Sequence, residues 1–195
     1  MTDYFSALQT DFLTPIREKI YQQVAMQFQI QTALYPGAGH DIIPSLSIPY
    51  VLYIENAPMY AGFYGDRKRI SSWLEARKSY SEPCIFEYDG TDYHSTRLAD
   101  RQFDLLISQY AGPVGQVMKP HLKSGGILLT AEGPEDADLA MRDPDYVLIG
   151  TINFAEQRAD ILSGYHEAAT FTIDDGAGGK FAIPIARSFC FRKLK

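Results

Sequence analysis

Apolar residues in this chain gather in short runs separated by stretches of helical spacing. The runs are nearly continuous and rich in branched and aromatic residues, which predicts strands covered on both faces. They lie at residues 33–35, 50–54, 84–88, 103–107 and 127–130. The stretches with the apolar spacing of helices lie at residues 41–46, 66–80 and 112–122. Strand alternating with helix predicts an α/β fold with a mostly parallel sheet.

The two ends of the chain follow other patterns. Thr14-Pro15 is a helix start, and apolar residues recur at every fourth position after it, which predicts an N-terminal helical segment within residues 1–30. Beyond residue 146 the chain is rich in turns and strand-like runs. These runs lie at residues 146–154, 171–173, 181–185 and 188–192. They predict an antiparallel C-terminal edge on the sheet within one domain of residues 1–195, and they assign no role to residues 155–180.

Composition and charge narrow the class of protein. Hydrophobic residues make up 46% of the 195, which predicts a folded globular chain rather than a disordered one. The net charge of −6 argues against a nucleic-acid partner, because the phosphate backbone is bound by Lys and Arg. Cys84 and Cys190 lie in strand-like runs and are expected as buried thiols. With no signal-peptide pattern and no membrane-spanning run, we expect a cytoplasmic protein and no membrane partner.

A glycine-rich bend follows the first predicted strand and is the strongest local motif. The strand at residues 33–35 ends at Pro36-Gly37-Ala38-Gly39, and Asp41 precedes the next apolar run. Glycines here permit positive φ and close approach of a ligand, and helix amides at such a turn point toward whatever binds. In an open parallel sheet, ligands bind beyond the carboxyl ends of strands. Glu55 after the second strand and Ser108 after the fourth would share that edge with the bend.

This order of motifs resembles the class I S-adenosylmethionine-dependent methyltransferases. Their acid-x-Gly-x-Gly loop is matched by Tyr35 to Gly39, and their second-strand acid by Glu55. The acid after their third strand is matched by Asp89, or less simply by Asp92, and their Leu-Lys-x-Gly-Gly run by residues 122–126. The match covers about residues 31–132 in order and the tail only loosely.

The resemblance implies a Rossmann-like three-layer sandwich with S-adenosyl-L-methionine as the cofactor. The expected cofactor-binding residues all follow predicted strands. They are Tyr35, Gly37, Gly39, Asp41, Glu55, Asp89 and Ser108. The second-strand acid is suited to accept hydrogen bonds from the ribose hydroxyls.

Three departures from the family pattern matter. Tyr35 stands in place of the first acid, which puts part of the contact to the methionine end in question, and Asp41 replaces the frequent third glycine. Residues 108–111 read Ser-Gln-Tyr-Ala and lack the Asp/Asn-Pro-Pro-aromatic signature of amino-methylating nucleic-acid enzymes. We therefore expect a small-molecule or protein acceptor.

A nicotinamide dehydrogenase is the nearest rival on fold. Its Gly-x-Gly-x-x-Gly turn cradles a pyrophosphate on helix amides. Here Ile42 occupies the third glycine position, and Asp41 would repel the phosphates. A sulfonium cofactor carries no phosphate, so the contrast favours S-adenosylmethionine.

Catalysis of methyl transfer needs mainly an acceptor held in line, because the sulfonium is already a good leaving group. Candidate bases near the expected mouth are Ser108, Tyr110 and His40, with Tyr35 and His94 also in reach. An ordinary turn residue remains the simpler interpretation of His40. Asp92 and His94 alternate without a third ligand, so no metal site is expected.

Two hypotheses remain from the sequence. The first is an S-adenosylmethionine-dependent methyltransferase. The second is a methyltransferase-like module that has lost catalysis and binds a nucleotide or a protein partner, and the missing first acid motivates it. No motif names the acceptor or the oligomeric state.

Overall fold

The computed structural model describes residues 4–10, 13–109, 111–132, 135–155, 158–164, 170–174, 180–184 and 188–195. Ten strands are described in chain order. They are β1 (Thr32–Pro36), β2 (Tyr50–Ile54), β3 (Ile85–Asp89), β4 (Phe103–Ser108), β5 (Leu122–Ala131), β6 (Tyr146–Ala155), β7 (Arg158–Leu162), β8 (Thr170–Asp174), β9 (Lys180–Pro184) and β10 (Ser188–Lys193). The helices are α1 (Tyr4–Thr10), α2 (Thr14–Phe28), α3 (Pro58–Gly65), α4 (Arg67–Glu75), α5 (Val114–Val117) and α6 (Glu135–Arg142), with 3₁₀ turns η1 (Ile43–Leu46) and η2 (Lys119–His121).

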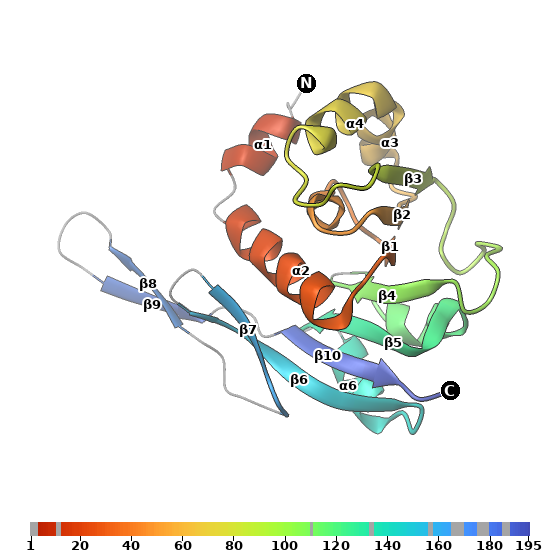
Figure 1. Ribbon diagram of the computed structural model, residues 1–195, viewed down its shortest axis with the longest axis vertical. Coiled ribbons are helices and arrows are strands. Elements are labelled where there is room, and N and C mark those ends of the chain that lie inside the picture. The colour runs from red at the N-terminus through yellow and green to blue at the C-terminus, as the bar shows by residue number, and fades with distance from the viewer. Residues whose placement is uncertain are drawn as a thin grey trace.

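Eight strands form one sheet in the order β3-β2-β1-β4-β5-β10-β6-β7 (Figure 1). The first five are parallel to their neighbours, whereas β10 is antiparallel to both β5 and β6, and β7 is antiparallel to β6. Strands β8 and β9 make a separate antiparallel ribbon that stands away from this sheet. The predicted α/β class and the antiparallel C-terminal edge are confirmed.

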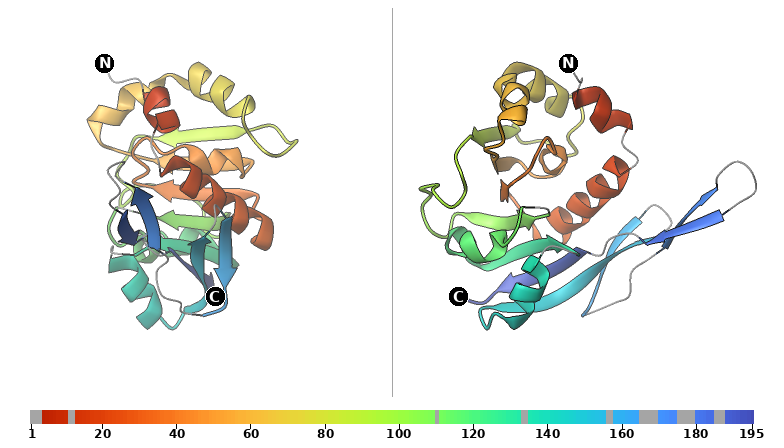
Figure 2. Two further views of the ribbon diagram at one scale, coloured as in Figure 1. Left: turned by 90° about the vertical axis from the view of Figure 1, so that its left-hand side faces the viewer. Right: turned by 180° about the vertical axis from the view of Figure 1, so that it is seen from behind.

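Helices cover both faces of the sheet, as the two further views make clear (Figure 2). Alternate residues of β1 enter opposite cores, because side chains of a strand point to opposite faces. Ala33 and Tyr35 pack with α2, η1 and α4, whereas Leu34 packs with α5 and α6. The three-layer arrangement therefore follows directly from continuous apolar strands.

The predicted helix at 112–122 is wrong. Helix α5 has only four residues and η2 three, and β5 already begins at Leu122. Pro120 has no N–H for a helical hydrogen bond, and Gly125 adopts φ +81° within β5. The β4–β5 register jumps from Phe103–Leu122 to Leu105–Ile127, so residues 123–126 form a bulge rather than a helix end.

Smaller differences concern other helices. The segment at 41–46 forms the 3₁₀ turn η1, which begins only at Ile43, with Pro44 at its start. The helix predicted at 66–80 ends at Glu75, and Asp66 caps its start by accepting a hydrogen bond from Arg69 N. Helix α3, the next element after β2, was not predicted, because its sequence lacks the apolar spacing of an amphipathic helix. None of the helices in the described ranges is long and apolar enough to cross a membrane.

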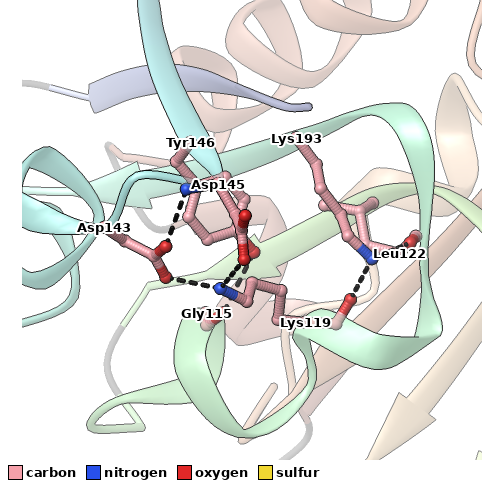
Figure 3. Close-up of polar contacts among 7 residues, drawn as sticks. All are labelled: Gly115, Lys119, Leu122, Asp143, Asp145, Tyr146 and Lys193. Carbon is pink, nitrogen blue, oxygen red and sulfur yellow. Dashed lines mark hydrogen bonds and ion pairs between the residues drawn. The ribbon is translucent and has the colours of Figure 1, made fainter. Parts of the chain in front are cut away.

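The last strand is fastened by a lysine network at the amino edge of the parallel strands (Figure 3). Lys193 is 5% exposed, and its Nζ donates to the carbonyl oxygens of Lys119 (2.8 Å) and Leu122 (2.7 Å). Burial lowers the pKa of Lys193. Lys119 Nζ in turn binds Asp143 (2.7 Å) and Asp145 (2.9 Å). These contacts fix β10 between β5 and β6.

Candidate functional site

The carboxyl ends of β1, β2 and β3 bring the glycine bend and two carboxylates to one edge. Gly37 N donates to Ile54 O over 2.7 Å, and Glu55 N donates to Asp89 O over 3.1 Å. Ile54 and Asp89 are partners in the β2–β3 register. Gly37, Glu55 and Asp89 therefore lie at one edge of the sheet, as the sequence predicted.

Glu55 links the glycine bend to the start of α3. Its Oε2 accepts a hydrogen bond from Gly39 N and its Oε1 accepts one from Ala57 N, each over 2.8 Å. The side chain is nearly buried, at 7% exposed for the residue. A carboxylate has about four lone-pair directions, so both oxygens retain capacity for further donors. The sequence indicated the acid but not its bonds to the loop.

Gly37 and Gly39 both have positive φ, at +63° and +59°. A Cβ added to Gly37 would lie 2.0 Å from the methyl carbon of Ala111, in the segment after β4. A Cβ added to Gly39 would lie 3.6 Å from the Tyr60 ring of α3, an ordinary contact. Glycine is thus required at position 37 by the positive φ and by the close segment after β4, and at position 39 by the positive φ alone.

Tyr35 and Asp41 face α2 and form a buried polar cluster with it. The hydroxyls of Tyr21 and Tyr35 donate to Asp41 Oδ2 over 3.2 and 3.3 Å, and Ile43 N donates to Oδ1 over 3.1 Å. Arg17 Nη1 lies 3.9 Å from Oδ2. Burial raises the pKa of Asp41, although Arg17 and the hydrogen bonds oppose that shift. These side chains brace the bend, and their binding of a cofactor stays a prediction.

The residues after β4 are held by an acid that the sequence did not single out. Ser108 is fully buried and its hydroxyl donates to Asp136 Oδ2 at the start of α6. The same oxygen accepts a hydrogen bond from Gly115 N over 2.6 Å. Burial raises the pKa of Asp136 against these two hydrogen bonds. Ser108 is therefore engaged with α6, and the only sequence signal for Asp136 was its place in an acidic first helical turn.

Aromatic side chains border the bend. The His40 ring lies 5.4 Å from that of Tyr4 and 5.9 Å from that of Tyr60, between centroids. Tyr4 also donates to Met59 O over 3.2 Å, so α1 is docked on α3 beside the bend. The predicted candidate Tyr110 lies outside the described residues.

The loop after β3 carries an exposed pair, Asp92 and His94. His94 Nδ1 lies 2.8 Å from Asp92 Oδ1, and the hydrogen bonds from His94 lower the pKa of Asp92. Between them, Tyr93 donates to Ala111 O over 2.7 Å and ties this loop to the segment after β4. Asp89 Oδ1 accepts from Thr91 N over 2.9 Å. Within the described residues, no three acids, histidines or cysteines are grouped to hold a metal.

An open hollow of about 500 Å³ lies at the opposite edge of the sheet, beside the C-terminus of α2. Ile30, Lys123 and Arg192 are among its lining residues. Beside this hollow, Lys123 forms an ion pair with Asp104 at 2.7 Å, which joins β4 to β5. The glycine bend, Glu55 and Asp89 lie at the carboxyl edge instead. The glycine bend remains the candidate site.

Several solved structures with similar folds are methyltransferases. The N-methyltransferase NodS from Bradyrhizobium japonicum WM9, in complex with S-adenosyl-L-homocysteine, has TM-score 0.58 and 11% identity, over 100% of this chain and 94% of that chain. A SAM-dependent O-methyltransferase from Thermotoga maritima has TM-score 0.58 and 12% identity, over 99% and 70%. The tRNA (m1A58) methyltransferase TrmI from Aquifex aeolicus has TM-score 0.56 and 11% identity, over 91% and 69%.

No protein-family model matches the sequence, and no curated protein matches it significantly. The similar solved structures show that the chain has the fold of the class I S-adenosylmethionine-dependent methyltransferases, which its motifs predicted. At this identity the likeness establishes the fold, and function rests on the site.

Proposed function

We propose that the chain binds S-adenosyl-L-methionine at the glycine bend and transfers its methyl group to a small-molecule or protein acceptor. The observation that carries the proposal is the Glu55 carboxylate, held at the carboxyl edge by Gly39 N and Ala57 N. Its orientation is fixed before any ligand arrives, which lowers the entropic cost of binding.

The residues present fit the nucleoside half of this cofactor. Glu55 and Asp89 end neighbouring strands, and carboxylate oxygens accept hydrogen bonds from hydroxyl and amino groups. Glu55 would hold the ribose hydroxyls and Asp89 would approach the adenine side. When bound, the cofactor supplies an activated methyl group on a sulfonium. The chain then has only to orient the acceptor and exclude water.

The methionine half has a weaker fit. The acid expected at position 35 is a tyrosine, and its hydroxyl donates to Asp41 within the cluster against α2. This observation favours a second candidate function, a methyltransferase-like module that binds an adenosine-containing ligand without transferring a methyl group.

The net charge of the chain supports our proposal for the class of methyl acceptor. The net charge of −6 disfavours a polyanionic acceptor, because nucleic-acid binding is driven by Lys and Arg side chains that displace counterions from the phosphates. One similar fold is named as a tRNA methyltransferase, so the fold itself permits nucleic-acid acceptors. A small-molecule or protein acceptor remains our proposal.

Titration calorimetry with S-adenosyl-L-homocysteine tests the proposed binding. We expect a dissociation constant in the micromolar range, about −8 kcal/mol, and no heat with NAD. Glu55→Ala should weaken binding by about tenfold or more, whereas Glu87→Ala, which removes a carboxylate from the middle of β3, should leave it unchanged. Absence of binding to the wild-type chain, or equal binding by Glu55→Ala, contradicts the proposal.

A further inference from the structure

The inference concerns the residue that holds Glu55 in place, and it rests on the proposed function. The backbone and carboxylate groups of Glu55 all have partners in neighbouring segments. Its N–H donates to Asp89 O (3.1 Å), its carbonyl oxygen accepts from the Tyr88 hydroxyl (2.9 Å), and its carboxylate accepts from Gly39 N and Ala57 N (2.8 Å each). Among the described residues, Tyr88 is therefore the partner that holds Glu55 with a side chain, and the others do so with their backbone.

The Tyr88 side chain is itself held firmly on β3, the edge strand beside β2. Its ring stacks on the buried ring of Tyr64 in α3, with centroids 4.3 Å apart and planes at 3°. Gly90 leaves room for the hydroxyl, since a Cβ there would lie 3.0 Å from it. Burial and the carboxylates of Glu55 and Asp89 raise the pKa of Tyr88, so the hydroxyl stays protonated and donates at neutral pH. The hydroxyl thus approaches Glu55 from a fixed direction.

The hydrogen bond from Tyr88 fixes the peptide group that joins Glu55 to Asn56. The following peptide carries Ala57 N, which holds one oxygen of the Glu55 carboxylate. A rotation of the first peptide would move that amide and turn the carboxylate with it. A binding site needs its polar groups held to within about 0.5 Å of the productive geometry. Tyr88 therefore controls the orientation of the acid that the proposed function assigns to the ribose.

We propose that Tyr88 is a positioning residue of the nucleoside site, which acts through Glu55 and makes the site select a ribonucleoside over its 2′-deoxy counterpart. The selected ligand class is an adenosine with both ribose hydroxyls and a 5′-sulfur substituent. Without the Tyr88 hydroxyl, the carboxylate is present but less ordered. Binding then has to include the cost of ordering it, and much of the gain from the 2′-hydroxyl is lost.

Calorimetry on the full chain with S-adenosyl-L-homocysteine and its 2′-deoxy analogue tests this. We expect the wild-type chain to bind the first ligand at least about tenfold more tightly. Tyr88→Phe removes the hydroxyl and keeps the ring that stacks on Tyr64. It should weaken binding of S-adenosyl-L-homocysteine by about fivefold or more and that of the analogue by less than about twofold.

Tyr50→Phe is the matched control. The Tyr50 hydroxyl also joins β2 to β3, because it donates to Glu87 over 2.7 Å, but it lies at the amino ends of the two strands. This variant loses the same kind of hydrogen bond and should bind both ligands as the wild-type chain does. Thermal unfolding of the two variants without ligand shows whether each retains the fold.

A double variant tests whether Tyr88 acts through the acid. Glu55→Ala with Tyr88→Phe should bind S-adenosyl-L-homocysteine within about twofold of Glu55→Ala alone, because the positioned carboxylate is already absent. A merely structural role of Tyr88 would instead weaken both ligands equally and would add to the effect of Glu55→Ala.

The outcomes separate the two proposals. Suppose that the wild-type chain binds S-adenosyl-L-homocysteine. A ratio between the two ligands that Tyr88→Phe leaves unmoved, equal binding of the two ligands by the wild-type chain, or additive effects in the double variant then overturns this inference and leaves cofactor binding standing. Absence of binding by the wild-type chain overturns both proposals.

Discussion

The backbone N–H of Gly39 donates to Oε2 of Glu55 over 2.8 Å, and so the glycine bend and the acid of the next strand form one unit. The second oxygen of Glu55 accepts from Ala57 N, which fixes the start of α3 to the same unit. Glu55 thus has a structural role that is independent of any ligand.

Glu55→Gln tests that task. The amide nitrogen cannot accept a hydrogen bond, so either Gly39 N or Ala57 N loses its partner in a nearly buried place. We expect the free energy of unfolding to fall by about 1–3 kcal/mol, measured by urea denaturation. Glu87→Gln on β3 serves as the control and should fall by less than about 0.5 kcal/mol. Equal stability of the two variants would contradict the assignment.

Gly37→Ala tests the contact with Ala111. The substitution places a Cβ 2.0 Å from that of Ala111 and forces a non-glycine residue to φ +63°. We expect a loss of stability of about 2–4 kcal/mol. The double variant Gly37→Ala with Ala111→Gly should recover the part due to the clash and retain about 1 kcal/mol of backbone strain. A double-mutant cycle in urea measures this coupling, and strictly additive effects would show that the two residues do not touch.

Asp136 is expected to hold the segment after β4. Asp136→Ala leaves the Ser108 hydroxyl and Gly115 N without their acceptor, and should cost about 2–4 kcal/mol in the free energy of unfolding. Asp136→Asn keeps an acceptor for Gly115 N and should cost less. Because burial raises the pKa of Asp136, ionisation opposes folding as the pH rises above the unfolded value of about 3.8. Urea denaturation from pH 4 to 7 should therefore show a smaller loss for Asp136→Asn at pH 7 than at pH 4.

Asp104 gives a pH dependence of the opposite sign. Burial tends to raise its pKa, but hydrogen bonds from Lys123, Thr32 and Gln31 outweigh this and lower it below 3.8. Its stabilising effect is complete above the unfolded pKa and is lost as the pH falls through the folded one. Asp104→Asn should cost about 1–3 kcal/mol at pH 7, and the difference from wild type should shrink below about pH 4. Thermal unfolding across this range measures it, and a difference that grows on acidification would refute the sign.

Lys193 provides a test remote from the site. Lys193→Met leaves the carbonyl oxygens of Lys119 and Leu122 without their donor (Figure 3). We expect stability to fall by about 1–3 kcal/mol with ligand affinity unchanged, because this network lies at the amino edge of the parallel strands. Lys195→Met, at an exposed position beyond β10, is the matched control and should have little effect on either quantity. A changed ligand affinity would indicate coupling between the two edges.

Several elements of the fold were predictable from local patterns in the sequence. Continuous apolar runs predicted β1, β2 and β4, because such runs indicate strands that are covered on both faces. The alternation of these strands with helical stretches predicted the parallel sheet. The helix expected at 112–122 was wrong because its apolar spacing runs through three separate elements, the four-residue helix α5, the 3₁₀ turn η2 and the start of β5 at Leu122. The bulge depends on pairing with β4, which local spacing does not encode.

The sequence by itself determined the α/β class, the glycine bend and the acid at the end of β2, since each depends on residues adjacent in the chain. Tertiary structure alone decided that Glu55 holds Gly39, that Asp41 turns inward to Tyr21 and Tyr35, and that Ala111 closes the side of Gly37. These relationships join residues from different elements. Their partners are fixed by how strands pair and helices pack, through contacts that no local pattern specifies.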